Sequence, residues 1–218
     1  MIIFDCNGVL VDSEPIAMSV AAEELQQVGL RVTPEIVARY FTGRRPADMF
    51  AEVEAATGIK LPHGFAAFVA AKTLKRLRED VRTMPHVVHA LTWLHGPKCV
   101  ASSSPLDRVR VSLECTDLLR FFEPHVFSAS HVPAGKPAPD LFLHAAGCTG
   151  KNPADCIVVE DSPAGVAAAV AAGMTAIGFV GGGHAALNLG PHLKAAGAKM
   201  VVADMRALKG AVVAIRGH

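Results

Sequence analysis

Short apolar runs that alternate with helical patterns are the feature that most constrains the fold of this 218-residue chain. The apolar runs cover residues 1–4, 98–101, 125–127, 156–159, 175–179 and 200–202. Helical patterns follow over 85–94, 106–113, 139–146 and 163–172. The last of these can begin with a Ser162 cap and Pro163, and it can end at Gly173. Such alternation is typical of β-α-β units and predicts an α/β fold, a Rossmann-like parallel sheet with helices on both faces.

One segment interrupts the alternation. Between residues 15 and 80 there is no strand candidate, and the helical patterns there cover 16–28, 34–40, 46–57 and 62–78. We therefore expect an α/β core domain formed by residues 1–14 and 81–218, with a small all-helical cap domain inserted at 15–80. Ligands of open α/β sheets bind beyond the carboxyl ends of the strands, and an insert that leaves from that edge would cover the site.

Composition excludes several classes of function. Lys and Arg number 21 against 20 Asp and Glu, so no electrostatic footprint for nucleic acid or a membrane surface is expected. No uninterrupted apolar run is long enough to predict a membrane span. The chain has five cysteines without CxxC spacing, which is typical of reduced thiols in a cytoplasmic protein. We expect a cytoplasmic protein.

Polar residues follow the first two strands at their carboxyl ends. Asp5 ends the first apolar run, Asn7 can face the same side of the extended chain, and Gly8 allows a close turn of the backbone. Ser102 and Ser103 follow the second run and precede a helix. Hydroxyls and free N–H groups at such a position suit an anion such as phosphate.

A lysine and an acidic pair complete this set of polar residues. Lys136 lies between a glycine and a proline ahead of a helix, and Glu160 and Asp161 end another buried run. If Glu160 and Asp161 face Asp5 at one sheet edge, their carboxylates would repel that of Asp5. A hard divalent cation such as Mg²⁺ would relieve that repulsion, since it prefers oxygen ligands and bridges to phosphate.

Together, the four motifs resemble those of the haloacid dehalogenase superfamily, and the resemblance covers essentially the whole chain. The stretch FDCNGVLVDSE at residues 4–14 matches its first motif, and Ser102, Lys136 and Glu160-Asp161 match the other three in order and spacing. GKPAPD at 135–140 and VEDS at 159–162 are especially similar to subfamily IA, in its β-phosphoglucomutase and phosphoglycolate phosphatase branch. The helical insert resembles the family's cap.

The resemblance implies a Mg²⁺-dependent phosphatase of a small phosphorylated metabolite, a sugar phosphate being the expected class. Asp5 would be the nucleophile that forms an aspartyl-phosphate. The other implied site residues are Gly8, Ser102, Ser103 and Lys136 for the phosphoryl group, Asp5, Asn7 through its carbonyl, Glu160 and Asp161 for the metal, and Arg44 or Arg45 in the cap for a second acidic group of the substrate. We expect a monomer, because a cap of this size can close the site without a partner.

Asn7 departs from the family pattern. Phosphatases of the family have an aspartate at this position, which protonates the leaving oxygen and then activates water. An amide cannot transfer a proton at neutral pH, so turnover should be impaired by about 10²- to 10⁴-fold. Asn7 could be an introduced change, a natural feature of a slow phosphatase that uses another acid or the substrate itself, or the mark of a protein that has left this chemistry.

Three other functions compete with a phosphatase. A phosphosugar mutase of this branch would carry a histidine where this chain has Ala17. A dehalogenase acting on carbon is disfavoured by Asn7 and by the Glu160-Asp161 pair. A non-catalytic relative would bind a phosphometabolite tightly with Mg²⁺ and release no product.

Overall fold

In the computed structural model, residues 1–41, 46–182 and 188–217 are described, with the backbone alone at 39–41 and 46–48. The chain divides into two compact units. The core unit consists of Met1–Asp12 and Arg82–His218, and the helical unit consists of Ser13–Val81. Each unit is described separately below.

A six-stranded sheet forms the centre of the core unit, and all of its strand pairs are parallel. The strands are β1 (Ile2–Phe4), β2 (Lys98–Ser102), β3 (Val126–Ser128), β4 (Ile157–Glu160), β5 (Thr175–Phe179) and β6 (Met200–Val202). Their order is β3-β2-β1-β4-β5-β6, so β1 lies between β2 and β4. The chain order reverses beside β1, and such a switch point is where open α/β sheets bind ligands. The predicted Rossmann-like parallel sheet is confirmed.

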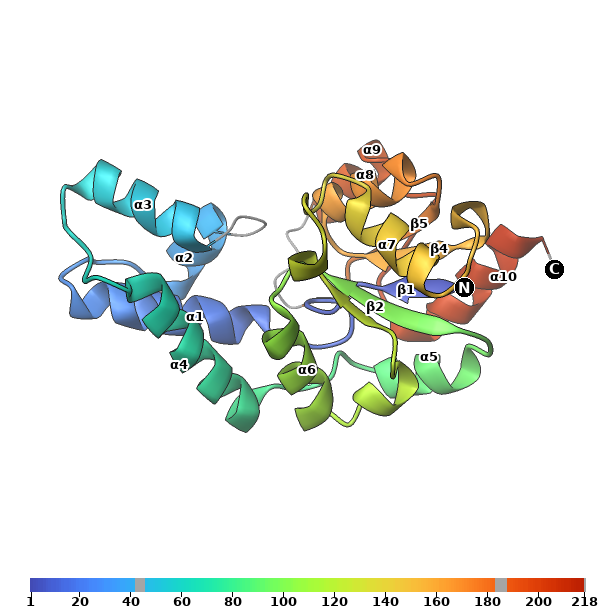
Figure 1. Ribbon diagram of the computed structural model, residues 1–218, viewed down its shortest axis with the longest axis horizontal. Coiled ribbons are helices and arrows are strands. Elements are labelled where there is room, and N and C mark those ends of the chain that lie inside the picture. Colours follow the sequence, from blue (N-terminus) through green and yellow to red (C-terminus); the bar gives the residue numbers. More distant parts are fainter. Residues whose placement is uncertain (42–45, 183–187, 218) are drawn as a thin grey trace. The chain divides into compact units, whose positions relative to one another are not determined.

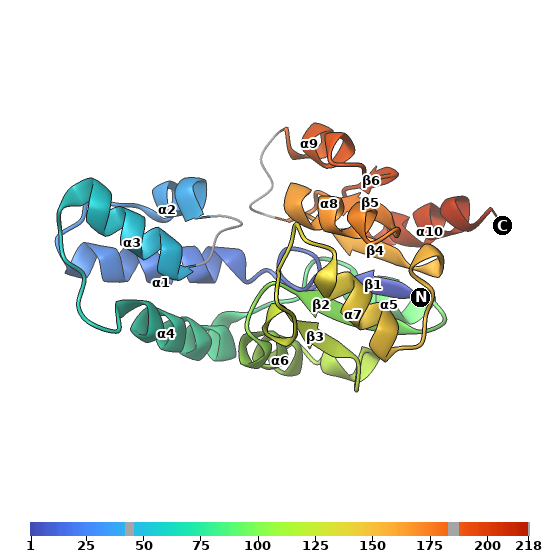
Figure 2. The ribbon, with the colours of Figure 1, turned by 45° about the horizontal axis from the view of Figure 1, so that its top comes forward.

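Helices cover both faces of this sheet, as predicted. On one face lie α7 (Asp140–Cys148), α8 (Pro163–Ala171) and α9 (Leu189–Ala195) (Figure 1). On the other lie α5 (Val87–Trp93), α6 (Leu106–Cys115) and α10 (Leu208–Arg216) (Figure 2). Short 3₁₀ turns are η1 (Leu119–Phe121), η2 (Ala129–His131), η3 (Pro153–Asp155) and η4 (Met205–Ala207). None of the described helices combines the length and the hydropathy needed to cross a bilayer.

Burial on both faces explains why the strands are continuous apolar runs. Along β1, Ile3 faces a core cluster that includes Phe142 of α7 and Val166 of α8. Phe4 packs edge-on against Phe122, with ring centroids 5.9 Å apart. Ile3 and Phe4 are both fully buried. Each side chain of this strand therefore removes apolar surface from water, which fixes β1 and the residue that follows it.

The described part of the helical unit, residues 13–41 and 46–81, contains four helices. They are α1 (Glu14–Gln27), α2 (Pro34–Phe41), α3 (Pro46–Thr57) and α4 (Phe65–Asp80). Their shared core includes Leu25, Val37, Phe50 and Val69. Lys72 of α4 forms an ion pair with Glu24 of α1, whose side chain is 9% exposed.

Some helix limits differ from the prediction. The fourth helix was expected from residue 62 but begins at Phe65, because Gly64 adopts a φ of 76° at the N-cap. The sequence patterns did not predict α9 and α10. Both helices contain a glycine, at Gly190 and Gly210, which weakens the helical signal.

Candidate active site

Asp5 follows the central strand β1 directly. Its N–H donates to the carbonyl of Val159 on β4 over 3.0 Å, and the residue is 7% exposed. Gly8 has a φ of 74° and donates its N–H to Val11, which turns the chain back immediately after the strand. The fold therefore delivers a nearly buried carboxylate to the switch point of the sheet.

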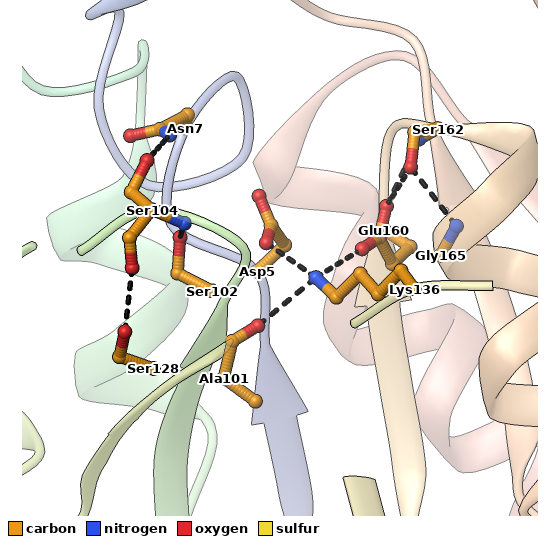
Figure 3. A network of polar contacts seen from close by, with 10 residues as sticks. All are labelled: Asp5, Asn7, Ala101, Ser102, Ser104, Ser128, Lys136, Glu160, Ser162 and Gly165. Atoms are coloured by element: carbon orange, nitrogen blue, oxygen red, sulfur yellow. Dashed lines mark hydrogen bonds and ion pairs between the residues drawn. The ribbon is translucent and has the colours of Figure 1, made fainter. Parts of the chain in front are cut away.

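Lys136 holds that carboxylate. Its Nζ donates to Asp5 Oδ1 over 2.6 Å, to Glu160 Oε1 over 2.5 Å and to the Ala101 carbonyl over 3.0 Å (Figure 3). These contacts use all three N–H bonds of the ammonium group. The Lys136 side chain is only 4% exposed. A single lysine therefore joins the ends of β1, β2 and β4.

Glu160 is anchored by the start of α8. Its Oε2 accepts hydrogen bonds from the N–H and the hydroxyl of Ser162, each over 2.9 Å. The same hydroxyl accepts the N–H of Gly165 over 3.0 Å and so caps the helix, as the sequence predicted. Both oxygens of Glu160 are therefore engaged, one by Lys136 and one by Ser162.

Gly165 makes room for this carboxylate. A Cβ atom at this position would lie 1.9 Å from Glu160 Oε1 and 2.4 Å from Oε2. Both distances are far below van der Waals contact. The absence of a side chain at Gly165 is thus a condition for the position of Glu160.

The site has more negative than positive charge. Burial raises the pKa of Asp5 from 3.8 to about 8; Lys136 opposes the rise, and Glu160 and Asp161 add to it. Burial by itself would lower the pKa of Lys136, but the carboxylates of Asp5 and Glu160 outweigh it and raise that pKa. Two carboxylates thus contact one ammonium group, a third, that of Asp161, acts on Asp5, and a further cation would be favoured.

Serine hydroxyls line the neighbouring strand ends. Ser102, the last residue of β2, is 1% exposed, and its Oγ accepts the N–H of Ser104 over 3.2 Å. The amide Nδ2 of Asn7 donates to Ser104 Oγ over 2.7 Å (Figure 3). The loop after β2 is thereby tied to the turn after β1.

The structure brings most of the residues singled out by the sequence to one edge of the core sheet. Asp5, Lys136 and Glu160 are in direct contact, and Asp161 is close enough to raise the pKa of Asp5. Ser103 lies in the loop after β2 and is exposed. Arg44 and Arg45 lie outside the described residues.

The donor set suits a hard cation, although it is small. Among the described residues, no group of three or more His, Cys, Asp or Glu side chains is placed to hold a metal ion. The candidate oxygen donors are the carboxylates of Asp5 and Asp161 and the carbonyl of Asn7, while both oxygens of Glu160 are bonded to Lys136 and Ser162. Mg²⁺ commonly binds through one or two carboxylates and keeps waters, so this set and its charge fit it.

The chain belongs to the haloacid dehalogenase-like hydrolase family, whose model matches residues 1–173. It is 30% identical to the 6-phosphogluconate phosphatase of Escherichia coli K12, over 84% of this chain and 83% of that protein. It is 32% identical to the fructose-1-phosphate phosphatase YqaB of the same organism, over 81% of this chain and 94% of that protein.

A solved structure extends the likeness to nearly the full chain. The haloacid dehalogenase-like protein of unknown function from Agrobacterium tumefaciens C58 superimposes with a TM-score of 0.87 at 36% identity. The match covers 99% of this chain and 98% of that one.

Sequence reasoning missed several residues that build the site. The sequence patterns assign no role to the side chains of Ser104 and Ser128, to Gly165 or to the Ala101 carbonyl. A glycine three residues after a helix cap, next to an acidic strand end, is a signal that could have identified Gly165. For Ser128, the only signal is a hydroxyl at a strand end, because the order of the strands is not visible in the sequence.

Proposed function

We propose that this protein is a Mg²⁺-dependent phosphatase of a small phosphorylated metabolite, with Asp5 as nucleophile and with turnover limited by Asn7. The observation that carries the proposal is the contact of 2.6 Å between Lys136 Nζ and Asp5 Oδ1 at the switch point of the sheet. A buried lysine that neutralises a carboxylate allows an anionic nucleophile to meet an anionic phosphate.

In the proposed reaction, a carboxylate oxygen of Asp5 attacks phosphorus while the bond from phosphorus to the ester oxygen breaks. The leaving alkoxide takes up a proton and departs as an alcohol. Water then attacks the phosphorus of the aspartyl-phosphate, loses a proton and releases inorganic phosphate with Asp5 restored. The first step needs a group that gives a proton to the leaving oxygen. The second step needs a group that takes a proton from water.

Ser102 would bind the phosphoryl group by a hydrogen bond, and Lys136 would bind it by charge, because its three N–H bonds are already used. The Ser102 Oγ accepts the N–H of Ser104, so its own proton is available to a phosphoryl oxygen. Lys136 supplies positive charge at the carboxylate that is attacked. Ser103 would add its backbone N–H, since it follows Ser102 directly. Gly8, whose N–H is bonded to Val11, would contribute by letting the backbone turn close to the ligand.

We propose that Asp5, the backbone carbonyl of Asn7 and Asp161 would hold Mg²⁺. When bound, the ion supplies positive charge that offsets the charge on the phosphoryl oxygens. Glu160 would contribute through its negative charge and by holding Lys136, because its two oxygens are bonded to Lys136 and Ser162.

Asn7 would make both proton transfers slow. Its amide has no titratable proton near neutral pH. Ser104 bonds Nδ2 and fixes the side chain near the loop that would bind phosphate. Folding and ligand binding are therefore retained in this proposal while acid–base catalysis is lost.

The substrate class is proposed from the relatives. Two of them, at 30% and 32% identity, are named for phosphatase activity on 6-phosphogluconate and fructose 1-phosphate. We propose a sugar phosphate, with the helical unit acting as the cap that selects it. Ala17 lacks a titratable side chain, which supports a hydrolase over a mutase.

The test is Mg²⁺-dependent phosphate release by the chain as it stands and by Asn7→Asp. The panel contains 6-phosphogluconate, fructose 1-phosphate and p-nitrophenyl phosphate. We expect Asn7→Asp to raise kcat by about 10²- to 10⁴-fold, and EDTA to remove the activity. Asn7→Ala is the matched control and should stay at or below the level of the starting chain. The double variant Asp5→Asn with Asn7→Asp should be inactive.

Other outcomes would exclude the proposal. If Asn7→Asp releases no phosphate from any substrate although it folds, phosphatase chemistry fails. Tight Mg²⁺-dependent binding of phosphate without turnover in either form would favour a binding protein. An isomeric sugar phosphate as the product, with no free phosphate, would favour a mutase.

A further inference from the structure

Ser128 is a buried hydroxyl that belongs to none of the four motifs. It ends β3 and pairs in register with Ser102, which ends the neighbouring strand β2. Its exposed fraction is 0%. A hydroxyl buried to this degree costs stability unless it is hydrogen bonded, so its partners indicate what it does.

The hydroxyl of Ser128 acts both as a hydrogen-bond donor and as an acceptor. It donates to the carbonyl of Ser104 over 2.7 Å and accepts the N–H of Ser130 over 3.1 Å. Its only proton goes to Ser104, so Ser130 must be the donor in the 3.0 Å contact between the two serine hydroxyls. The N–H of Ser128 donates to His131 Nδ1 over 3.3 Å, which closes a capping box over η2.

Ser104 connects Ser128 to the candidate active site. Its carbonyl accepts from Ser128, its N–H donates to Ser102 Oγ, and its hydroxyl accepts from Asn7 (Figure 3). Ser128 therefore fixes the carbonyl of Ser104, and the N–H of the same residue orients the Ser102 hydroxyl. Because Ser128 has no exposed surface, its influence on a ligand must be indirect, and its bond to the Ser104 carbonyl leads to the site.

We propose that Ser128 is a positioning residue that, through the backbone of Ser104, orients the Ser102 hydroxyl toward the phosphoryl group. This inference rests on the proposed function of the same site. Ser128→Ala removes the donor to the Ser104 carbonyl and releases the loop. The Ser104 N–H then no longer has a fixed direction, and the Ser102 hydroxyl loses its orientation.

The experiment measures the Kd of inorganic phosphate by calorimetry at saturating Mg²⁺, with the full chain and with Asn7 unchanged. Ser128→Ala and Ser102→Ala should each weaken binding about tenfold, the loss of one hydrogen bond to a charged group. The double variant should be no weaker than Ser102→Ala alone, because both changes remove the same bond. Ser130→Ala is the matched control, since it belongs to the same turn but does not contact Ser104, and its Kd should stay within about twofold.

A purely structural role of Ser128 would give a different result. Additive effects in the double variant, or a parent-like Kd for a folded Ser128→Ala, would overturn the inference. If Ser128→Ala does not fold, Ser128→Cys retains a weak donor and should still bind phosphate less tightly than the parent; parent-like binding by this variant would also refute it. A parent chain that binds no phosphate at all would instead refute the proposed function, and this inference with it.

Discussion

Replacing Gly165 by alanine should disconnect Lys136 from Glu160. The new Cβ would lie 1.9 Å from Glu160 Oε1, so the carboxylate must move by about 1.5 Å to reach an ordinary contact of 3.4 Å. Its bond of 2.5 Å to Lys136 cannot survive that movement. Since the Lys136 and Glu160 side chains are at most 4% exposed, breaking their contact leaves a buried charge without this partner.

The expected loss of stability follows from these contacts. Breaking a buried ion pair costs about 3–5 kcal/mol. Alanine in place of glycine inside a helix returns about 1 kcal/mol. We therefore expect Gly165→Ala to lower the free energy of unfolding of the core unit by about 2–4 kcal/mol.

Urea unfolding followed by tryptophan fluorescence is a suitable assay. Trp93 is the only tryptophan in the chain and lies on α5, so the signal reports on the core unit. Gly210→Ala is the matched control, because Gly210 is the third residue of α10, as Gly165 is of α8, and no atom lies within 4 Å of its Cβ position. This control should be neutral or stabilising by up to about 1 kcal/mol.

Adding the change to a Glu160→Ala background separates the clash from any other effect. Once the carboxylate is removed, Gly165→Ala should cost nothing further, because the atoms it would meet are gone. If Gly165→Ala is as stable as Gly210→Ala, or equally damaging with and without Glu160, the reasoning about this contact is wrong.

Two further predictions concern charge at the site. Mg²⁺ at 100 times its Kd contributes about 2.7 kcal/mol and should raise the Tm by about 5–10 °C in a thermal shift assay. Asp161→Asn should reduce this rise. An unchanged rise would show that Asp161 does not belong to the metal site. Without metal, the pKa of Asp5 is raised from 3.8 to about 8, chiefly by burial, so the folded state favours its protonated form. The stability that protonated Asp5 contributes is present below pH 4 and is lost as the pH rises toward 8. In EDTA, the Tm of the parent should therefore fall more between pH 5 and 8.5 than the Tm of Asp5→Asn. Parallel curves of Tm against pH would contradict the expected direction.

The sequence was sufficient for the sheet and for the residues at its strand ends. The apolar runs predicted all six strands because strands buried on both faces leave no polar alternation. Asp5 and Glu160 stood out because each ends such a run with a charge. The contact that joins them through Lys136 could be expected from the family resemblance.

What the sequence lacked is the lateral order of the strands. The link between Ser128 and Ser104 exists because β3 is the neighbour of β2, and no local pattern states this. The role of Gly165 depends on where a side chain from the preceding strand ends, which is again a tertiary fact. Helices α9 and α10 were missed because their stability comes from packing on β5 and β6 rather than from propensity.

The central position of β1 has a consequence for synthesis on the ribosome. Ile2 pairs with Lys98 on one side and with Ile157 on the other, so the first strand to be made waits longest for its second neighbour. At 5–20 residues per second, that neighbour emerges roughly 8–30 s later. Until then one edge of β1 has no partner, and Asp5 lacks Glu160, although Lys136 has already been made. The site is therefore completed only when β4 pairs with β1 and brings Glu160 to Lys136.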